Sequence, residues 1–207
     1  MTEAVRPRML EWGAATRARP GENDSGDLAV VTRTASGTLV AAFDGAGHGP
    51  EAARAARAGA DAVRGYGGGE DLFALVVRCH EALRGTRGAA ASIAFFPAGA
   101  DEMTWLGIGD VAGRVFAADG ARPQAKSALR LAAGVVGHEL ATVMRERVEL
   151  RRGDVLVFAT DGVEASFAEE ISLAGAPQEI ADRILDAHWK PSDDGLVLVV
   201  RYLGEGR

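Results

Sequence analysis

Apolar and polar residues alternate at strand spacing along much of the chain, and this pattern predicts a series of short strands. The expected strands are Met9–Ala15, Leu28–Thr34, Thr38–Phe43, Ala89–Phe96, Met103–Ile108, Val111–Ala117, Thr142–Leu150, Asp154–Thr160 and Leu196–Tyr202. Glycine-containing turns predict two antiparallel pairs, one joined by Ala35-Ser36-Gly37 and the other by Arg151-Arg152-Gly153. The strands between Ala89 and Ala117 are expected to form a meander.

Helical spacing of apolar residues occurs in three longer segments. The expected helices run from Pro50 to Val63, from Asp71 to Arg84 and from Pro177 to Trp189. Proline and acidic residues at the start of these segments favour a helix N-terminus. The segment from Asp119 to Gly137 has no clear pattern. Many antiparallel strands, with two long helices early and one late, predict an α+β fold in which helices cover the faces of a sheet sandwich.

Composition narrows the class of protein. The chain has 207 residues, 47% of them hydrophobic and 25% charged, which predicts a single domain, 1–207, with a sizeable core. A net charge of −6 argues against nucleic acid as a partner. Since the N-terminal stretch lacks an apolar signal core and no apolar run approaches the ~20 residues that cross a bilayer, we expect a cytoplasmic chain without membrane contact. The single cysteine, Cys79, excludes an internal disulfide.

Five aspartates stand at or beside the ends of predicted strands. They are Asp27, Asp44, Asp110, Asp161 and Asp193. Carboxylates gathered in one pocket repel one another and are costly to desolvate, so such a cluster persists mainly where divalent cations neutralise it. An aspartate before a glycine, taken alone, is usually a turn residue. The combination of five strand-end aspartates nevertheless favours a shared metal site.

Several motifs in a fixed order extend this signal over nearly the whole chain. They are Ser25-Gly26-Asp27, Phe43-Asp44-Gly45-Ala46-Gly47-His48-Gly49-Pro50, Arg87-Gly88-Ala89, Gly107-Ile108-Gly109-Asp110-Val111, Gly153-Asp154-Val155-Leu156, Ala159-Thr160-Asp161-Gly162-Val163 and Asp193-Asp194. With them the chain resembles the metal-dependent protein serine/threonine phosphatases of the type 2C superfamily, and more narrowly the bacterial branch containing SpoIIE and the stressosome phosphatase RsbX. The resemblance implies a four-layer α/β/β/α sandwich, in which helices flank two central antiparallel sheets.

The resemblance also implies two manganese or magnesium ions at one edge of the sheets. Asp44 would bridge both ions, and the carbonyl of Gly45 would help to hold the second. Asp161 and Asp193 would complete the shell of the first ion, while Asp27 would orient water around the second.

Asp110 matches an aspartate that contributes to a third, weaker metal position in many relatives. The implied reaction is hydrolysis of phosphoserine or phosphothreonine by metal-activated water, with in-line attack on phosphorus and no covalent phosphoenzyme. Positioning and electrostatic stabilisation would supply most of the rate enhancement.

The chain departs from the family pattern in three places. Eukaryotic relatives place a proposed general acid, a histidine, where this chain has Ala46; His48, two positions further along, is a candidate acid or a residue of the helix entry. No arginine in the first fifteen residues matches the phosphate clamp of the eukaryotic enzymes. Leu196 replaces a frequent threonine after the final acidic pair, which leaves open whether Asp193 or Asp194 is the ligand; Asp193 is favoured.

Two other functions are compatible with parts of the pattern. A glycine loop between a strand and a helix is also typical of dinucleotide sites, but the spacing of Gly45, Gly47 and Gly49 and the predicted hairpin before them argue against one. A catalytically inactive phosphatase-like module that only binds a partner is the non-enzymatic alternative, suggested by Ala46 and the unusual final strand.

The remaining reactive residue types have structural explanations. Asp154 follows Gly153 in a turn and is assigned no catalytic role. Cys79 fits the apolar face of a helix. The histidines His80, His138 and His188 lack the spacing of metal ligands.

A catalytic domain without sensor segments resembles RsbX more than the multidomain SpoIIE proteins. This implies a phosphorylated STAS-domain protein as the substrate, in a stressosome-type or partner-switching pathway. An anti-sigma-factor antagonist is the alternative substrate, and the sequence leaves both open. Candidate docking surfaces are the helix face with Arg54, Arg57 and Arg64 and the region from Asp119 to His138.

Overall fold

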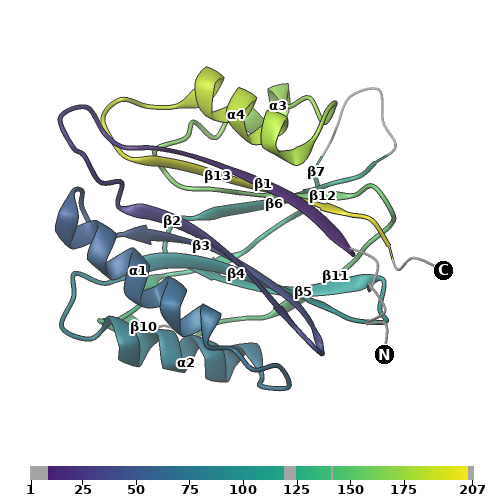
Figure 1. The fold of residues 1–207 in the computed structure, drawn as a ribbon, viewed down its shortest axis with the longest axis horizontal. Coiled ribbons are helices and arrows are strands. Elements are labelled where there is room, and N and C mark those ends of the chain that lie inside the picture. The colour runs from purple at the N-terminus through teal and green to yellow at the C-terminus, as the bar shows by residue number, and fades with distance from the viewer. Residues whose placement is uncertain (1–8, 119–124, 141, 205–207) are drawn as a thin grey trace, which may run out of the picture.

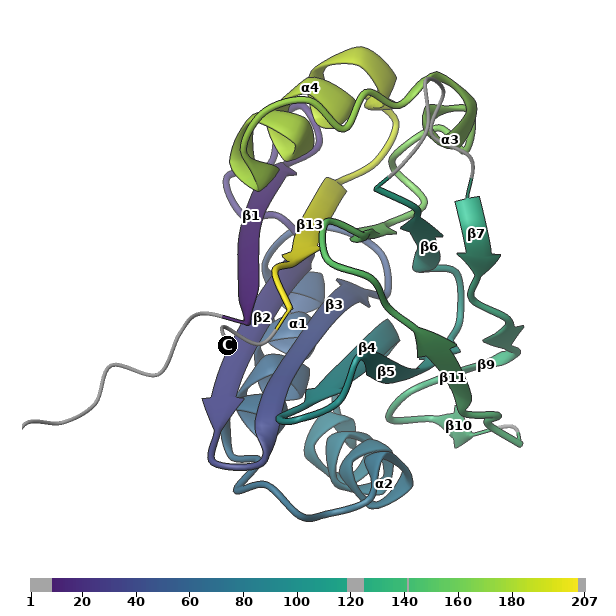
Figure 2. The same cartoon turned by 90° about the vertical axis from the view of Figure 1, so that its right-hand side faces the viewer.

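The computed structural model describes residues 9–118, 125–140 and 142–204. Two sheets pack face to face and helices cover their outer faces, so the expected four-layer α/β/β/α sandwich is confirmed (Figures 1 and 2). The helices are α1 (Pro50–Arg64), α2 (Leu72–Leu83), α3 (Phe167–Glu170) and α4 (Pro177–His188). Figure 1 shows α1 and α2 against one sheet, and α3 and α4 against the other.

The first sheet carries the strands at both ends of the described chain. Its order is β1 (Leu10–Arg17), β13 (Gly195–Tyr202), β12 (Val155–Ala159), β6 (Ala112–Phe116) and β7 (Ala125–Ala128). All neighbours in it are antiparallel. The central strands β12 and β13 are buried almost throughout, because the second sheet covers one face and α4 the other. Their sequences are therefore nearly continuous apolar runs.

The second sheet contains the predicted hairpin. Its order is β11 (Glu146–Glu149), β5 (Glu102–Ile108), β4 (Ala89–Pro97), β3 (Gly37–Gly45) and β2 (Asp27–Thr34), with β8 (Leu131–Ala132) added parallel to β5. The short strands β9 (Gly134–Val135) and β10 (Glu139–Leu140) form a separate ribbon. Thus the segment from Asp119 to Gly137, which had no clear pattern, contains short strands in its described part. Residues 119–124 lie outside the described residues.

The predicted meander is only partly correct. β4 and β5 pair as expected, but β6 leaves their sheet and pairs with β12 and β7. Gly109 makes the crossover, since its φ of +87° is one that other residues rarely adopt, and a Cβ there would lie 2.5 Å from that of Ala90. β12, buried on both faces, needs a hydrogen-bonded neighbour on each edge, and β6 supplies one of them.

The predicted pair around Arg151-Arg152-Gly153 is wrong. β11 joins β5 in the second sheet, whereas β12 joins β6 and β13 in the first. The buried carboxylate of Asp154 organises this crossover: it accepts hydrogen bonds from the backbone N–H groups of Arg151 (2.8 Å) and Ala118 (3.1 Å) and pairs with Lys126. Asp154 is therefore a structural residue, and the turn connects two sheets instead of two paired strands.

Three apolar layers hold the sandwich together, and β12 shows how one strand serves two of them. Leu156 and Phe158 point into the layer between the sheets, while Val155 and Val157 pack under α4. The third layer lies between the second sheet and the pair α1–α2, and it includes Cys79. No helix in the described part of the chain combines the length and apolar character needed to cross a membrane.

Helix α1 packs closely on β3 because its buried face consists of small residues. Ala52, Ala56 and Gly59 are among the buried positions of the helix. A Cβ at Gly59 would lie 2.5 Å from Cε1 of Phe43, a side chain with no exposed surface. This close approach sets the distance between the helix and the strand that ends in the Asp44-Gly45 motif.

We expect Gly59→Leu to destabilise the protein by over-packing this contact, with a cost of about 1–3 kcal/mol, even though leucine favours a helix over glycine by ~0.8 kcal/mol. For a domain of this size the corresponding fall in Tm is roughly 3–10 °C. The measurement is thermal unfolding followed by circular dichroism. Gly67→Ala is the matched control, because a Cβ at Gly67 meets nothing within 4 Å; equal Tm values for the two variants would contradict the prediction.

Candidate functional site

The strand-end aspartates meet at one end of the sandwich. Asp44, Asp110, Asp161 and Asp193 line a single cavity of about 230 Å³. Asp44 comes from the end of β3, and the others flank the ends of β5, β12 and β13, so both sheets contribute. Asp44 lies within β3, whose last residue is Gly45, and not just past the strand as expected. The fold thus brings together residues that are more than a hundred positions apart.

Asp27 and Asp44 face each other across the hairpin, since they are direct partners in the register of β2 and β3. Burial raises the pKa of Asp44 to about 9, and the nearby charges of Asp27 and Asp161 add to the effect. Burial likewise raises the pKa of Asp27 to about 7, although a hydrogen bond of 2.8 Å from the hydroxyl of Thr160 opposes the shift. The site therefore gathers carboxyl groups whose ionised forms are unfavourable unless a cation neutralises them.

Asp161 continues this cluster from the first sheet. Partial burial and the neighbouring carboxylates of Asp110 and Asp193 raise its pKa, while the ammonium group of Lys190 opposes the rise. Lys190 follows α4 in the chain, and its backbone N–H donates to the carbonyl of Gly162 at 2.8 Å. Lys190 was not singled out from the sequence. Lys190 is far from Asp161 in the chain, so nothing in the sequence indicated that the two residues lie together.

Gly45 is buried under α1, and the structure gives a reason for glycine here. A Cβ at this position would lie 2.1 Å from the backbone oxygen of Ala52, so no other residue fits without moving the helix. The N–H of Gly45 donates to the carbonyl of Gly26 at 3.0 Å. Helix packing therefore requires a glycine at the position whose carbonyl the family resemblance assigns to a metal.

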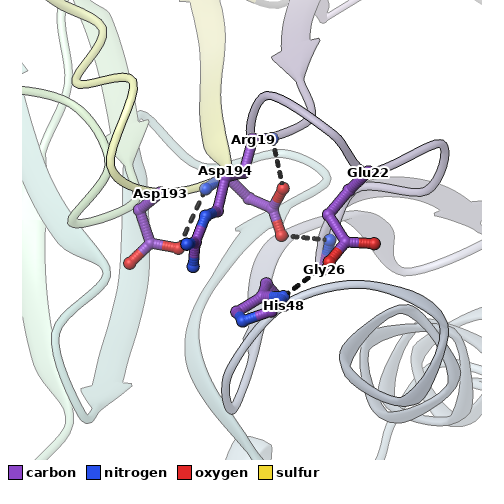
Figure 3. A network of polar contacts seen from close by, with 6 residues as sticks. All are labelled: Arg19, Glu22, Gly26, His48, Asp193 and Asp194. Atoms are coloured by element: carbon purple, nitrogen blue, oxygen red, sulfur yellow. Dashed lines mark hydrogen bonds and ion pairs between the residues drawn. The ribbon is translucent and has the colours of Figure 1, made fainter.

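The adjacent residues Asp193 and Asp194 occupy different environments. Asp193 lines the cavity. Asp194 is buried, and its two carboxylate oxygens accept hydrogen bonds from the backbone N–H groups of Arg19 (2.8 Å) and Gly26 (2.7 Å), as Figure 3 shows. Since both oxygens of Asp194 are already engaged, the geometry favours Asp193 as the residue able to reach an ion.

His48 and Ala46 both line the cavity. The Nδ1 atom of His48 is 2.7 Å from Oε1 of Glu22, a contact from the loop before β2 (Figure 3). The other three histidines lie outside the cavity lining. His80 and His138 contact backbone groups near Gly137 and Thr86, which fits the packing role expected of them; His188 lies 3.5 Å from the hydroxyl of Ser166.

Besides Lys190, two further site residues were missed by sequence reasoning. Glu22 gave no signal because it stands in a turn-rich loop where acidic residues are common. Arg19 lines the cavity beside His48 and Asp193, but it falls outside the first fifteen residues, where a phosphate-binding arginine was sought. In Figure 3 the side chain of Arg19 extends toward these two residues.

The donor set fits magnesium or manganese, because hard divalent cations prefer carboxylate and backbone carbonyl oxygens. Within the described ranges, no three acidic, histidine or cysteine side chains lie close enough together to hold one ion as they stand. An ion such as magnesium keeps several waters and needs only one or two protein carboxylates, so water would complete its shell here.

A family model described as stage II sporulation protein E (SpoIIE) matches residues 34–203. No curated protein matches the chain significantly by sequence.

Solved structures match over almost the full chain. A protein from a structure described as "The bacterial stressosome: a modular system that has been adapted to control secondary messenger signaling" is 27% identical, with a TM-score of 0.83 over 94% of this chain and 100% of that chain. RsbX in complex with magnesium is 20% identical, with a TM-score of 0.78 over 93% and 95% of the two chains. The PP2C phosphatase domain of SpoIIE from Bacillus subtilis, solved with a fragment of the regulatory domain, is 20% identical, with a TM-score of 0.72 over 96% of this chain and 64% of that chain.

The raised carboxyl pKa values predict how the stability of the metal-free protein depends on pH. Asp44 has an ordinary pKa of 3.8 and a folded value of about 9. Its contribution to stability is therefore complete below about pH 4 and is lost as the pH rises toward 9. We expect Asp44→Asn, which carries no charge, to raise Tm at pH 8 in EDTA by at least ~2–4 °C, the shift that about 1 kcal/mol produces in a domain of this size.

The difference in Tm between Asp44→Asn and the wild type should shrink as the pH is lowered toward 4, because Asp44 of the unfolded chain then also holds its proton and folding no longer requires proton uptake. Thermal melts in EDTA at several pH values test this. Asp182→Asn on the exposed face of α4 is the control for a general loss of negative charge; a Tm difference for Asp44→Asn that does not vary with pH would contradict the prediction.

Proposed function

The chain belongs to the SpoIIE family of PP2C-type serine/threonine protein phosphatases, and we propose that it hydrolyses phosphoserine and phosphothreonine on a STAS-domain protein, acting as a single phosphatase domain in the cytoplasm. The observation that carries this proposal is the cavity where both sheets end, around which the fold gathers five mutually repelling carboxylates. Such a cluster is expected where divalent cations bind.

Two divalent cations would be held by residues of both sheets. Asp44 and the carbonyl of Gly45 would approach them from β3, Asp161 and Asp193 from the first sheet, and Asp27 from β2 across from Asp44. Manganese or magnesium would acidify water for attack on phosphorus and neutralise charge on the phosphate. RsbX, which shares the fold, was solved in complex with magnesium.

Asp110 is the residue proposed for a third, weaker metal position. It lies on the cavity wall, exposed to solvent, next to Gly109 at the crossover between the sheets. A ligand at an exposed position binds an ion weakly, because water competes for it. The exposed location of Asp110 therefore supports a weak third metal position. Catalysis would not require an ion at this position in each turnover.

The substrate phosphate requires positive charge besides the ions. Arg19 on the cavity wall and Lys190 near Asp161 are two cationic side chains at the site. A guanidinium group presents several N–H donors to phosphate oxygens. Arg19 is thus proposed as a phosphate contact, at a place in the loop before β2 where sequence reasoning expected none.

The proposed partner is a phosphorylated STAS-domain protein of a stressosome-type complex. The solved protein with the stressosome description is 27% identical to this chain and is covered along its whole length, which supports this class of partner. An anti-sigma-factor antagonist, also a STAS-domain protein, is the alternative substrate. Dephosphorylation assays with the two kinds of purified phosphoprotein would separate them.

The candidate docking helix receives little support from its contacts. Arg54 pairs with Glu51 at 2.9 Å and Arg64 with Asp61 at 2.6 Å, each within one turn of α1. Arg57 donates to the carbonyl of Ala53 at 3.1 Å. Local pairs of this kind are typical of a solvated helix face, so the docking surface for the partner is not assigned to α1.

We expect the wild-type protein to release phosphate from p-nitrophenyl phosphate and from a phosphoserine peptide when manganese is added, and not in EDTA. Asp44→Asn and Asp161→Asn should each lower kcat by about 10²-fold or more, because every metal ligand contributes several kcal/mol of electrostatic stabilisation. Asp24→Asn, an exposed aspartate of the loop before β2, is the control. A folded wild-type protein that is inert toward these substrates and toward a phosphorylated STAS protein would favour the binding-module alternative.

The different contacts of Asp193 and Asp194 predict different consequences of the same substitution. Asp194→Asn should lower Tm in EDTA, because the amide NH2 that replaces one carboxylate oxygen cannot accept the N–H group bound there, and an unsatisfied buried donor costs about 1–3 kcal/mol. Asp193→Asn should leave Tm in EDTA nearly unchanged and weaken manganese binding by at least about tenfold. Thermal melts and isothermal titration calorimetry with manganese distinguish the two effects, and the reverse assignment would show that Asp194 is the ligand.

A further inference from the structure

His48 lines the cavity, and Figure 3 shows its ring beside the carboxylate of Glu22. Nδ1 of His48 is 2.7 Å from Oε1 of Glu22, and the side chains are 45% and 27% exposed. Such an exposed pair contributes little to stability. Because an ionised carboxylate only accepts hydrogen bonds, Nδ1 carries the proton, and Nε2 on the opposite side of the ring is left free for a group in the cavity that His48 lines.

The loop that carries Glu22 is held firmly. The buried carboxylate of Asp194 accepts the backbone N–H groups of Arg19 and Gly26, one on each side of Glu22. The N–H of Glu22 itself donates to the carbonyl of Arg19 at 3.0 Å. The carbonyl of Gly26 then accepts from the N–H of Gly45 at 3.0 Å. Glu22 is therefore presented to His48 by a loop tied to Asp194, just before β13, and to Gly45, at the end of β3.

The start of α1 also leaves room for the carboxylate of Glu22. Gly49 precedes the first residue of the helix with a φ of +74°, and a Cβ there would lie 2.8 Å from Oε2 of Glu22. Gly49 offers the helix no side-chain cap. A carboxylate near this end of the helix is favoured by the helix dipole. The geometry holds Glu22 between the N-terminus of α1 and the ring of His48.

We propose that Glu22 is a positioning residue that orients His48 to protonate the leaving group, an inference that rests on the proposed phosphatase function. Water attacks phosphorus and gives up one proton to solvent, and the bond between phosphorus and the serine oxygen breaks. The doubly protonated ring of His48 gives its Nε2 proton to that oxygen, which leaves as the serine hydroxyl, and the ring regains a proton from solvent. Glu22 keeps the Nδ1 proton throughout and so fixes which nitrogen faces the substrate.

The test compares two leaving groups. A serine alkoxide needs a proton to leave, whereas p-nitrophenolate does not. General-acid catalysis contributes about 10²–10⁴-fold, so His48→Asn is expected to lower kcat for a phosphoserine peptide by about 10²-fold or more. Glu22→Ala should lower it by about tenfold or more, and Glu22→Gln by less, because the amide oxygen still accepts from Nδ1. With p-nitrophenyl phosphate all three should stay within roughly threefold of the wild type.

Two further results are expected if Glu22 acts through His48. The double variant Glu22→Ala/His48→Asn should be no slower on the peptide than His48→Asn alone, since coupled residues are not additive. Nitrogen NMR of the metal-free protein should show the neutral ring of His48 protonated on Nδ1 in the wild type, and a loss of this preference in Glu22→Ala. Asp24→Asn is the control, because Asp24 lies in the same loop and its carboxylate is only in distant contact with Arg57, at 3.8 Å. This variant should change neither the rate on the peptide nor the ring tautomer of His48.

Equal losses with both substrates, or no loss with the peptide, would overturn the role of Glu22 and His48 while leaving the phosphatase function intact. An unchanged ring tautomer in Glu22→Ala would overturn the positioning contact. A wild-type protein without metal-dependent hydrolysis of either substrate would instead overturn the proposed function, and the inference with it.

Discussion

Repulsion among the carboxylates at one end of the sandwich is the constraint on which the rest of the site depends. Asp27 and Asp44 stand opposite each other in the β2–β3 register, and the pKa of Asp44 rises to about 9 as a result of burial and of its acidic neighbours. Groups that repel stay together only if the surrounding structure is rigid. The three apolar layers provide this rigidity, because β3 and β12 are buried on both faces and a one-residue slip would exchange the side chains between layers.

The same constraint explains why small residues surround the cluster. Gly45 lies against the backbone of α1 and Gly109 turns the chain from one sheet to the other. Each allows backbone segments to approach more closely than a side chain would permit. The carboxylates are consequently held at the ends of strands and beside tight turns.

Much of the fold followed from local patterns in the sequence, and the errors share one cause. The hairpin before Asp44 and the helices α1, α2 and α4 are each specified by neighbouring residues, so periodicity and turn residues were sufficient. The wrong pairings involve β6 and β12, where a turn carries the chain into the other sheet. An apolar strand that is buried on both faces has the same sequence pattern in either sheet, so the pattern does not indicate its partner. In the site, strand-end aspartates were visible as motifs. Glu22 and Arg19 were not, because their roles depend on where the loop is anchored.

Asp194 anchors this loop. Asp193 and Asp194, two adjacent aspartates, therefore have different roles. The backbone at the start of β13 turns Asp193 toward the cavity and Asp194 toward the loop before β2, where both its oxygens are used by N–H groups. The loop then places Glu22 against His48, so a histidine two positions later than in the eukaryotic relatives still has a partner that fixes its ring. A residue that the motif offered as an alternative metal ligand thus holds the loop that carries Glu22.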